Sequence, residues 1–306
     1  NEVSQAQEVN SLELDDSDDS VFNQFSTQFL RGMSERMRET YSKSQLNDFL
    51  KERFTFFREA TRRSGMVRVK PHQLTSFPQG ETRINGHVIV EIASPDAPFI
   101  VVTLEALMRQ MDLLIYRKLH PIMGAILAVE REIVKVVSPL EDSEKFDYIY
   151  LEIEADSDSV SLKRLQTKIA VHMLAVQLVL NHRQNMLERL ESMEKVIDSV
   201  AVVSAETKDE WAKLCGWLML DNLTLMGYIT FVHKVTDSVD LIKILENSGL
   251  GILSPTYSDK SSNELLNVLT AHLRKRRHSE LPFALDRIRF TSPVLRFENL
   301  MMLSLR

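Results

Sequence analysis

The chain has 306 residues, of which 44% are hydrophobic and 26% are charged, so its composition is that of a globular protein long enough for two domains. It contains one cysteine, which excludes an internal disulfide and any zinc site built from several cysteines. The formal net charge of −6 gives no sign of the clustered positive field that nucleic acid requires. The single G-x-G, at residues 249–251, lacks the third glycine of a dinucleotide-binding loop.

Acidic charge is concentrated at the beginning of the chain. Residues 1–20 contain acidic side chains and no basic one, which is typical of a segment that does not fold. The single Cys215 fits a reducing compartment, and no segment has the basic-then-apolar pattern of a signal peptide. The longest apolar stretch, residues 169–180, is too short to cross a bilayer. We therefore expect a cytoplasmic protein that contacts neither membrane nor nucleic acid.

Helices are predicted within residues 21–64, where phenylalanine and leucine recur at intervals of three or four residues. Ser44 begins a plausible cap region for the second of these helices. Gly65 ends that helix, and a short extended segment follows at 66–69. The prolines and glycines of residues 71–86 predict a loop.

The most regular pattern follows this loop. A buried strand at residues 87–93 leads through a turn with two prolines to a helix at 99–111. Further strands are predicted at residues 113–119, 122–129, 132–137 and 146–154. The order β-α-β-β-(β)-α is that of a ferredoxin-like α/β sandwich.

A long helix is predicted at residues 159–200. No glycine or proline occurs from 140 to 215, and apolar residues step by three and four along the segment. About 38 continuous residues would span about 57 Å, which exceeds a small domain. We therefore expect part of the apolar stripe to meet another element or another subunit. A break near Asn181 and His182 is the alternative.

A second unit with the same α/β theme is predicted after residue 205. Its expected elements are a helix at 208–220, strands at 223–235, 241–245 and 251–253, a helix at 264–276, and strands at 288–290, 294–297 and 300–305. The predicted fold class is thus α+β, with tandem ferredoxin-like sandwich modules, an N-terminal helical segment and a long connecting helix. The expected divisions are a disordered tail at 1–20, the helical segment at 21–70, a first module at 71–204 and a second module at 205–306.

The sequence offers no catalytic constellation. Its eight histidines show neither H-x-x-x-H nor H-E-x-x-H spacing, so no metal site is predicted. There is no G-x-S-x-G motif, and Cys215 lies on an amphipathic helix where packing is the simplest role. Carboxylate pairs such as Asp156 and Asp158 lie in turns and caps, where they stabilise helix starts. We therefore predict no catalytic residue, no cofactor site and no metal in this chain.

The turn between the strand at 87–93 and the following helix is the best candidate for a ligand site. A helix N-terminus offers free N–H groups and a positive dipole that favour a carboxylate or a phosphate, and two prolines make the turn rigid. The candidate ligand-binding residues are Ser94, Asp96, Ala97 and Pro98. A plain strand–helix connection is the alternative interpretation.

A run of basic residues closes the helix predicted at 264–276. The run consists of Arg274, Lys275, Arg276 and Arg277. Positive charge at a helix C-terminus complements the helix dipole, which is the simpler interpretation. Contact with an anion or with a partner protein is the alternative.

Several short segments occur in the same order as in a known protein family. They are residues 66–69 (MVRV), 88–92 (VIVEI), 96–99 (DAPF), 119–121 (LHP), 217–228 (WLMLDNLTLMGY), 248–253 (SGLGIL) and 295–306 (LRFENLMMLSLR). In this order they resemble the N-terminal region of the large bacterial NAD-dependent glutamate dehydrogenases. The resemblance covers residues 20–306, with Val102 and Thr103 standing where the family has Asp-Ser.

The resemblance implies ACT-like modules, which commonly bind amino acids or mediate subunit contacts, with the dehydrogenase chemistry in a later part of a longer chain. This implies a non-catalytic regulatory and oligomerisation region of an enzyme that converts L-glutamate and NAD to 2-oxoglutarate, ammonia and NADH. NAD is then expected in the parent enzyme and not here. We expect a homo-oligomer that responds to an amino-acid effector. The alternative is a stand-alone ACT-like protein that binds a small ligand.

Overall fold

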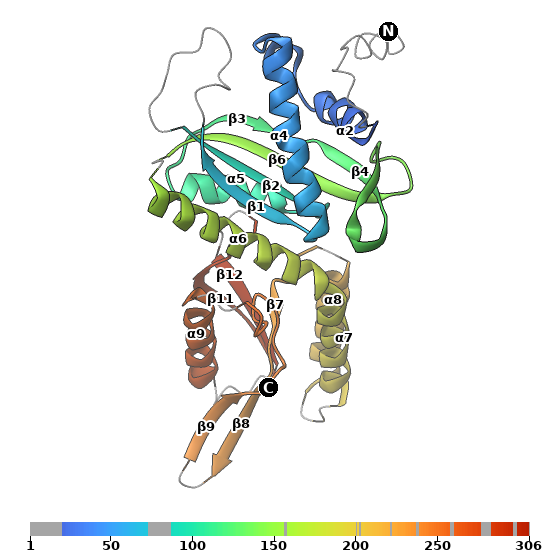
Figure 1. Cartoon of the computed structure of the whole chain (residues 1–306). Coiled ribbons are helices and arrows are strands. Elements are labelled where there is room, and N and C mark those ends of the chain that lie inside the picture. Colours follow the sequence, from blue (N-terminus) through green and yellow to red (C-terminus); the bar gives the residue numbers. More distant parts are fainter. Residues whose placement is uncertain are drawn as a thin grey trace. The chain divides into compact units, whose positions relative to one another are not determined.

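The computed structural model describes residues 20–72, 87–155, 158–199, 201, 203–220, 222–236, 239–257, 260–276, 283–295 and 299–305 (Figure 1). The chain divides into two compact units. One consists of Asn1–Val101 and Met108–Ala170, and the other of Val102–Leu107 and Val171–Arg306. No helix in the described parts of the chain is long and apolar enough to cross a membrane.

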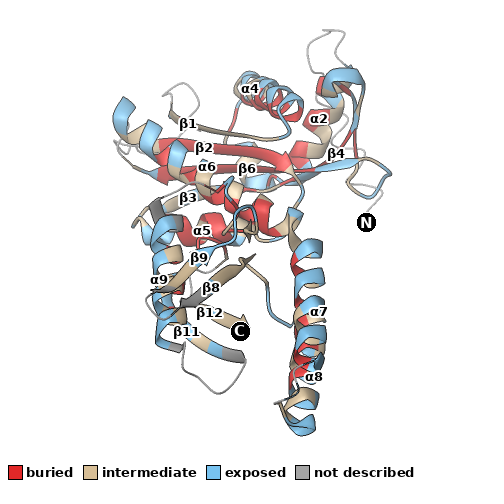
Figure 2. Cartoon of the chain, turned by 90° about the horizontal axis from the view of Figure 1, so that it is seen from below, coloured by how far each residue is buried: buried red, intermediate tan, exposed pale blue. Residues whose placement is uncertain are grey.

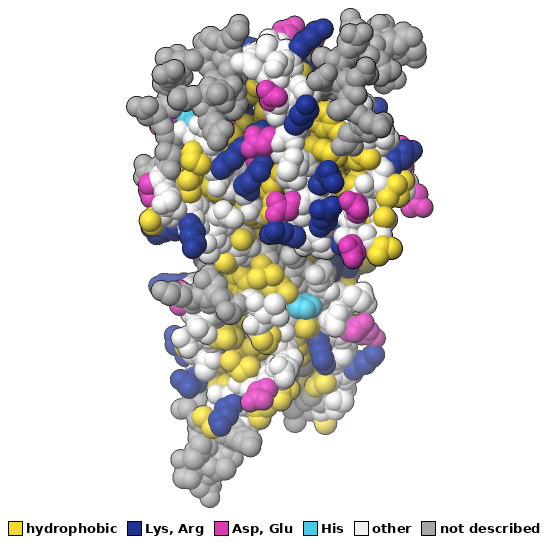
Figure 3. Space-filling view, viewed as in Figure 1, with side chains coloured by type: hydrophobic (Ala, Val, Ile, Leu, Met, Phe, Trp, Pro, Cys, Tyr) yellow, Lys and Arg dark blue, Asp and Glu magenta, His cyan; other side chains and the backbone are white. Residues whose placement is uncertain are grey.

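The first unit begins with helices, as the sequence predicts. They are α2 (Ser20–Arg31), α3 (Glu35–Glu39) and α4 (Lys43–Arg62). The cap of α4 is Ser42 rather than Ser44: the Ser42 hydroxyl accepts a hydrogen bond from the Gln45 N–H, and the Gln45 side chain accepts one from the Ser42 N–H. This reciprocal capping box satisfies N–H groups that a helix start leaves free. The solvent side of α4 mixes basic and acidic side chains (Figure 3).

An antiparallel six-stranded sheet forms the centre of the first unit. Its strands are β1 (Met66–Pro71), β2 (His87–Pro95), β3 (Ile115–Leu119), β4 (Ile122–Leu127), β5 (Ile133–Val137) and β6 (Glu144–Glu154). The order is β1-β2-β6-β4-β5, and β3 also pairs with β6. Because β2 lies along one edge of β6, β3 and β4 follow each other along its other edge. A short 3-10 turn, Val129–Arg131, joins β4 to β5.

Both sides of the central strands are buried, so β2 shows no alternation of exposed and buried residues. On the side that faces α2 and α4, an aromatic core surrounds Tyr148 of β6. The Tyr148 ring lies 5.2 Å from the ring of Phe29 and 5.8 Å from that of Phe56, measured between centroids. Helices α5 (Ile100–Gln110) and α6 (Ser159–Asn181) begin on the opposite side of the sheet (Figure 2).

The outer edges of this sheet are occupied or irregular. At β1 the Gln166 side chain donates to the Val67 carbonyl, at 3.1 Å. At β5 the Gln24 side chain accepts from the Val136 N–H, at 3.0 Å. The pairing of β3 with β6 shifts register at Tyr116, and such bulges discourage further strand pairing.

The second unit has less continuous secondary structure than predicted. Its elements are the end of α6, α7 (Arg183–Ser199), α8 (Ala205–Met219), β7 (Gly227–Tyr228), β8 (Phe231–Thr236), β9 (Val239–Ile244), β10 (Leu250–Gly251), α9 (Lys260–Arg276), β11 (Phe283–Thr291) and β12 (Asn299–Leu305). Within the described residues the strands form three two-stranded sheets, β7–β10, β8–β9 and β11–β12. The predicted strand 223–235 is two short strands. Of the predicted strand 294–297, Val294 and Leu295 lie in a turn and 296–297 lie outside the described residues.

The long helix predicted at 159–200 is broken at His182, which was the alternative interpretation. The His182 Nδ1 atom accepts a hydrogen bond from the Gly251 N–H at 3.0 Å. Beyond the break, α7 and α8 pack around Trp211 and Cys215. Cys215 is buried in this core, and burial raises the pKa of its thiol to about 11.

Candidate functional site

The loop between β2 and α5 is fastened to strand β6 by its backbone. The Asp96 N–H donates to the Lys145 carbonyl at 2.8 Å. The Ala97 N–H donates to the Asp147 Oδ2 atom at 3.3 Å. Phe99 then adopts a φ of 77°, in the left-handed region that a bulky side chain rarely enters. The loop therefore reaches α5 in a conformation that its neighbours must hold.

Asp147 of β6 is the side chain that contacts this loop. It lies on β6, is 2% exposed and stands opposite Ser94 in the strand pairing. Its Oδ1 atom lies 2.7 Å from the His120 Nε2 atom. Asp147 thus connects β6 with the loop and with the junction between β3 and β4. A buried polar group needs such hydrogen-bond partners.

Asp96 and Asp147 are neighbouring carboxyl groups. Burial and the neighbouring Asp147 raise the pKa of Asp96, while Lys145 and His120 act in the opposite direction. Asp96 is exposed to solvent, whereas Asp147 is buried. The Ser94 hydroxyl is buried beside this pair without a hydrogen-bond partner among the described residues.

The structure brings together part of the predicted ligand site. Ser94, Asp96 and Ala97 gather around Asp147, and Pro98 is exposed at the start of α5. Sequence reasoning missed Asp147 because it lies in an alternating strand 50 residues from Ala97. His120 lies in the segment at 119–121, where no role was predicted for it.

The basic run at the end of α9 shows no converging acceptor or pocket within the described residues. Arg274 and Lys275 are exposed. The side chain of Arg276 and all of Arg277 lie outside the described residues. Contact of this run with an anion or a partner stays a prediction.

A second polar cluster surrounds Glu152 of β6, which is 2% exposed. Its carboxylate accepts from the Tyr150 hydroxyl at 2.7 Å and lies 3.6 Å from His72 and 3.5 Å from Arg117. Burial acts to raise the pKa of Glu152, but His72, Arg117 and Tyr150 outweigh it, so the pKa is lowered. The cluster stabilises one ionised carboxylate inside the sheet.

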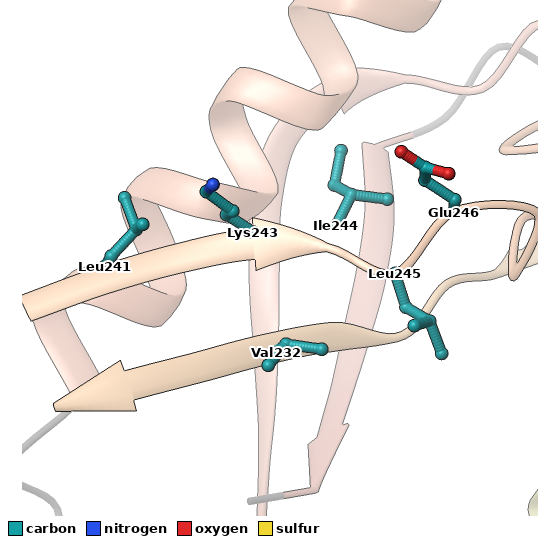
Figure 4. A pocket seen from close by; sticks show the side chains of 6 residues that line it. All are labelled: Val232, Leu241, Lys243, Ile244, Leu245 and Glu246. Carbon is teal, nitrogen blue, oxygen red and sulfur yellow. The ribbon is translucent and has the colours of Figure 1, made fainter.

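The second unit has a hollow of about 280 Å³ on the β8–β9 hairpin (Figure 4). Val232, Leu241, Ile244 and Leu245 line it, together with the charged residues Lys243 and Glu246. The hollow is therefore mainly apolar, with one lysine and one glutamate in its lining. Among the described residues no three His, Cys, Asp or Glu side chains are grouped so that they could hold a metal ion.

Part of the chain is similar to known proteins. Residues 25–169 match the family model described as the ACT1 domain of glutamate dehydrogenase. The NAD-specific glutamate dehydrogenase of Halomonas elongata is 20% identical over 191 residues, which are 58% of this chain and 12% of that protein. The chain thus spans about 12% of the length of that relative. Residues 25–169 are therefore similar to the ACT1 domain of glutamate dehydrogenase.

Proposed function

We propose that the chain is a regulatory and assembly region of an NAD-dependent glutamate dehydrogenase and that it is not catalytic by itself. The observation that supports this proposal is how the first unit uses its buried charges. Arg53, Glu91, Asp147 and Glu152 each have a hydrogen-bond or ion-pair partner within the unit. Catalytic groups are usually directed into a pocket where a substrate can reach them. These four side chains instead join secondary-structure elements.

The proposed parent reaction is the oxidation of L-glutamate by NAD to 2-oxoglutarate and ammonia. In this proposal the substrate and NAD bind elsewhere in the parent enzyme. The support is the ACT1 match together with the similarity to an NAD-specific glutamate dehydrogenase. An ACT domain in such an enzyme would transmit binding of an effector to the catalytic part through two states of different affinity.

The β2–α5 loop is the proposed effector site. An amino acid carries an ammonium group, which suits the exposed Asp96 carboxyl group, and a carboxylate, which suits free N–H groups at the start of α5. Assembly is proposed to use helices or faces of the units rather than the edges of the first sheet, because Gln166, Gln24 and the bulge at Tyr116 obstruct those edges.

Two measurements test the proposal. The purified chain is mixed with L-glutamate and NAD, and NADH formation is followed by absorbance; we expect none, and turnover would show that the chain is catalytic. A melting-temperature screen with single amino acids should find one that raises the Tm, because a ligand that binds only the folded state stabilises it. Asp96→Asn should abolish that shift, and a screen without any shift would exclude the effector role.

A further inference from the structure

His182 and Gly251 are joined by a hydrogen bond whose direction is fixed. The donor is the Gly251 backbone N–H and the acceptor is the His182 Nδ1 atom, at 3.0 Å. A backbone N–H only donates, so Nδ1 must present its lone pair and the neutral ring carries its hydrogen on Nε2. An imidazolium has a hydrogen on both nitrogens and accepts no hydrogen bond. This contact therefore exists only while the His182 ring is uncharged.

Gly251 has little freedom to find another partner for its N–H. The residue is buried, and its φ of +60° lies in the left-handed region. The next N–H, that of Ile252, donates to the Met226 carbonyl at 2.9 Å and fixes the turn against β7. A buried N–H without a partner is costly. Loss of the His182 bond would therefore force the turn to open to water.

His182 also marks the bend between α6 and α7, which run in different directions (Figure 1). Its own N–H donates to the Leu178 carbonyl at 3.1 Å, and its carbonyl accepts from the Met186 N–H at 2.9 Å. The backbone of His182 thus belongs to the end of α6 and the start of α7, while its ring reaches β10. One side chain joins the helix bend to the turn at Gly251.

The strands beside this contact offer no counter-charge to a protonated ring. Helix α7 packs against β7 and β10. The segments around these strands, residues 226–230 and 248–257, contain no charged side chain, and their titratable groups are the hydroxyls of Tyr228 and Tyr257. The end of α6, residues 174–181, carries no charged side chain either.

The charges on α7 itself are mainly positive at this point. Arg183 follows His182 directly, and Arg189 lies two turns further along the same helix face. The Arg189 guanidinium is 5.9 Å from the centroid of the Tyr228 ring, on β7. In the first two turns of α7 the one acidic residue is Glu188, which is exposed. A proton on the ring would therefore add a positive charge where two already stand.

We propose that His182 is a pH-operated lock of the second unit, closed while its ring is neutral and released when the ring takes up a proton. As the pH falls, a proton from water binds to Nδ1 and occupies the lone pair that the Gly251 N–H had used. Two N–H groups then face each other, so the ring turns away and the turn at Gly251 opens. The bend between α6 and α7 loses its tie to β10. The lock operates between about pH 5 and pH 8, where histidine changes charge.

The lock goes beyond the proposed regulatory function, because its ligand is the proton and it requires neither an amino acid nor the rest of an enzyme. It also lies in the second unit, whereas the proposed effector site lies in the first. Failure of the amino-acid screen would leave the lock untouched, and failure of the lock would leave the effector site untouched.

The test follows a single amide of the intact chain by NMR. Leu250–Gly251 is the only Leu-Gly pair in the sequence. Labelling leucine with ¹³C at the carbonyl and glycine with ¹⁵N therefore gives one signal for a ¹⁵N bonded to a ¹³C carbonyl, that of the Gly251 N–H. Its exchange with water is measured from about pH 8 to about pH 5 and corrected for the intrinsic rate at each pH. In the unmodified chain the corrected rate should rise severalfold on acidification.

Variants of His182 assign this rise to its ring. His182→Asn keeps an acceptor oxygen on Cγ, where Nδ1 stood, and does not titrate in this range, so the corrected rate should stay low throughout. Asparagine also suits the position before a helix. His182→Ala has no acceptor and should show the raised rate already at about pH 8. His233→Gln, at an exposed histidine of β8, is the matched control and should behave as the unmodified chain.

Two outcomes exclude the lock. The first is a corrected rate for the Gly251 N–H of the unmodified chain that stays constant, or falls, as the pH is lowered. The second is an equal rise in His182→Asn and in the unmodified chain, because another group would then open the turn. If His182→Ala does not fold, the comparison with His182→Asn decides alone.

Discussion

Arg53 of α4 and Glu91 of β2 face each other inside the first unit, with 3.5 Å between the Arg53 Nε and Glu91 Oε1 atoms and neither side chain more than 1% exposed. Glu91 also receives hydrogen bonds from Arg68, at 2.6 Å, and from the Tyr148 hydroxyl, at 2.8 Å. The Arg53 guanidinium lies 4.0 Å above the Phe49 ring. Glu91 of β2 therefore links α4, through Arg53, to β1, through Arg68, and to β6, through Tyr148.

Removing this carboxylate charge should destabilise the first unit strongly. In Glu91→Gln the Arg53 guanidinium keeps its ion pair with the partly exposed Glu52 at 2.6 Å but loses its buried counter-charge, so we expect a loss of about 2 kcal/mol in the free energy of unfolding. Glu132→Gln removes an exposed partner of Arg62 and should leave the unfolding midpoint nearly unchanged. Urea titrations followed by circular dichroism measure both. Equal midpoints for the two variants would contradict the role given to Glu91.

Two glycines of the second unit should respond in opposite directions to alanine. A Cβ at Gly251, where φ is +60°, would lie 2.1 Å from the Met226 carbonyl oxygen. We expect Gly251→Ala to cost at least about 2 kcal/mol. A Cβ at Gly216 in α8 would meet no atom within 4 Å, and alanine favours helix, so Gly216→Ala should stabilise by about 0.5–1 kcal/mol. Thermal melts of the two variants side by side check the pair, and a stable Gly251→Ala would disprove the close approach.

Helix α6 should tolerate a charge at an exposed position but not at a buried one. Val176 is 0% exposed and Val160 is 76% exposed on the same helix. Val176→Glu would bury an unpaired carboxylate and should lower stability by about 3 kcal/mol or more. Val160→Glu places the same group in water and should have little effect. Denaturant unfolding measures the stability of each variant, and light scattering measures its association. Equal losses of stability in the two variants would contradict the burial of Val176.

Acid should weaken the first unit through Glu152. Its pKa is lowered from 4.5 in the folded chain, so the unfolded chain binds a proton more readily. The stabilisation is therefore present above about pH 4.5 and is lost as the pH falls through the lower folded-state pKa. Glu152→Gln should show a smaller fall in Tm than the unmodified chain over this acidic range. Parallel falls in Tm would show that Glu152 does not contribute.

The first unit was predictable because its periodicities are regular. In β6 aromatic residues on one face alternate with mainly aliphatic ones on the other, and α4 shows the helical spacing of one apolar face; both signals are local. The strands of the second unit were harder to predict because they are short. Gly251 and the turn at Val294 also interrupt segments whose apolar residues indicate continuous strands.

The candidate site was predictable only in part. The turn from Ser94 to Pro98 carries a local signal, since two prolines stand between a strand and a helix. Asp147 and His120 reach the loop only through strand pairing, and no local pattern encodes a contact between residues 27 and 50 positions apart. Likewise, Ser42 rather than Ser44 caps α4, because Gln45 is placed to return its hydrogen bond.

The glutamine contacts at the sheet edges have a practical consequence for shortened versions of the protein. Removing α2 would remove Gln24 and leave the Val136 N–H open beside the apolar surface that α2 covers. An uncovered edge strand beside the apolar surface that the phenylalanines of α2 normally cover is a template for intermolecular β-pairing and fibre growth. A fragment intended to stay dispersed at high concentration should therefore begin before Ser20 and keep this helix.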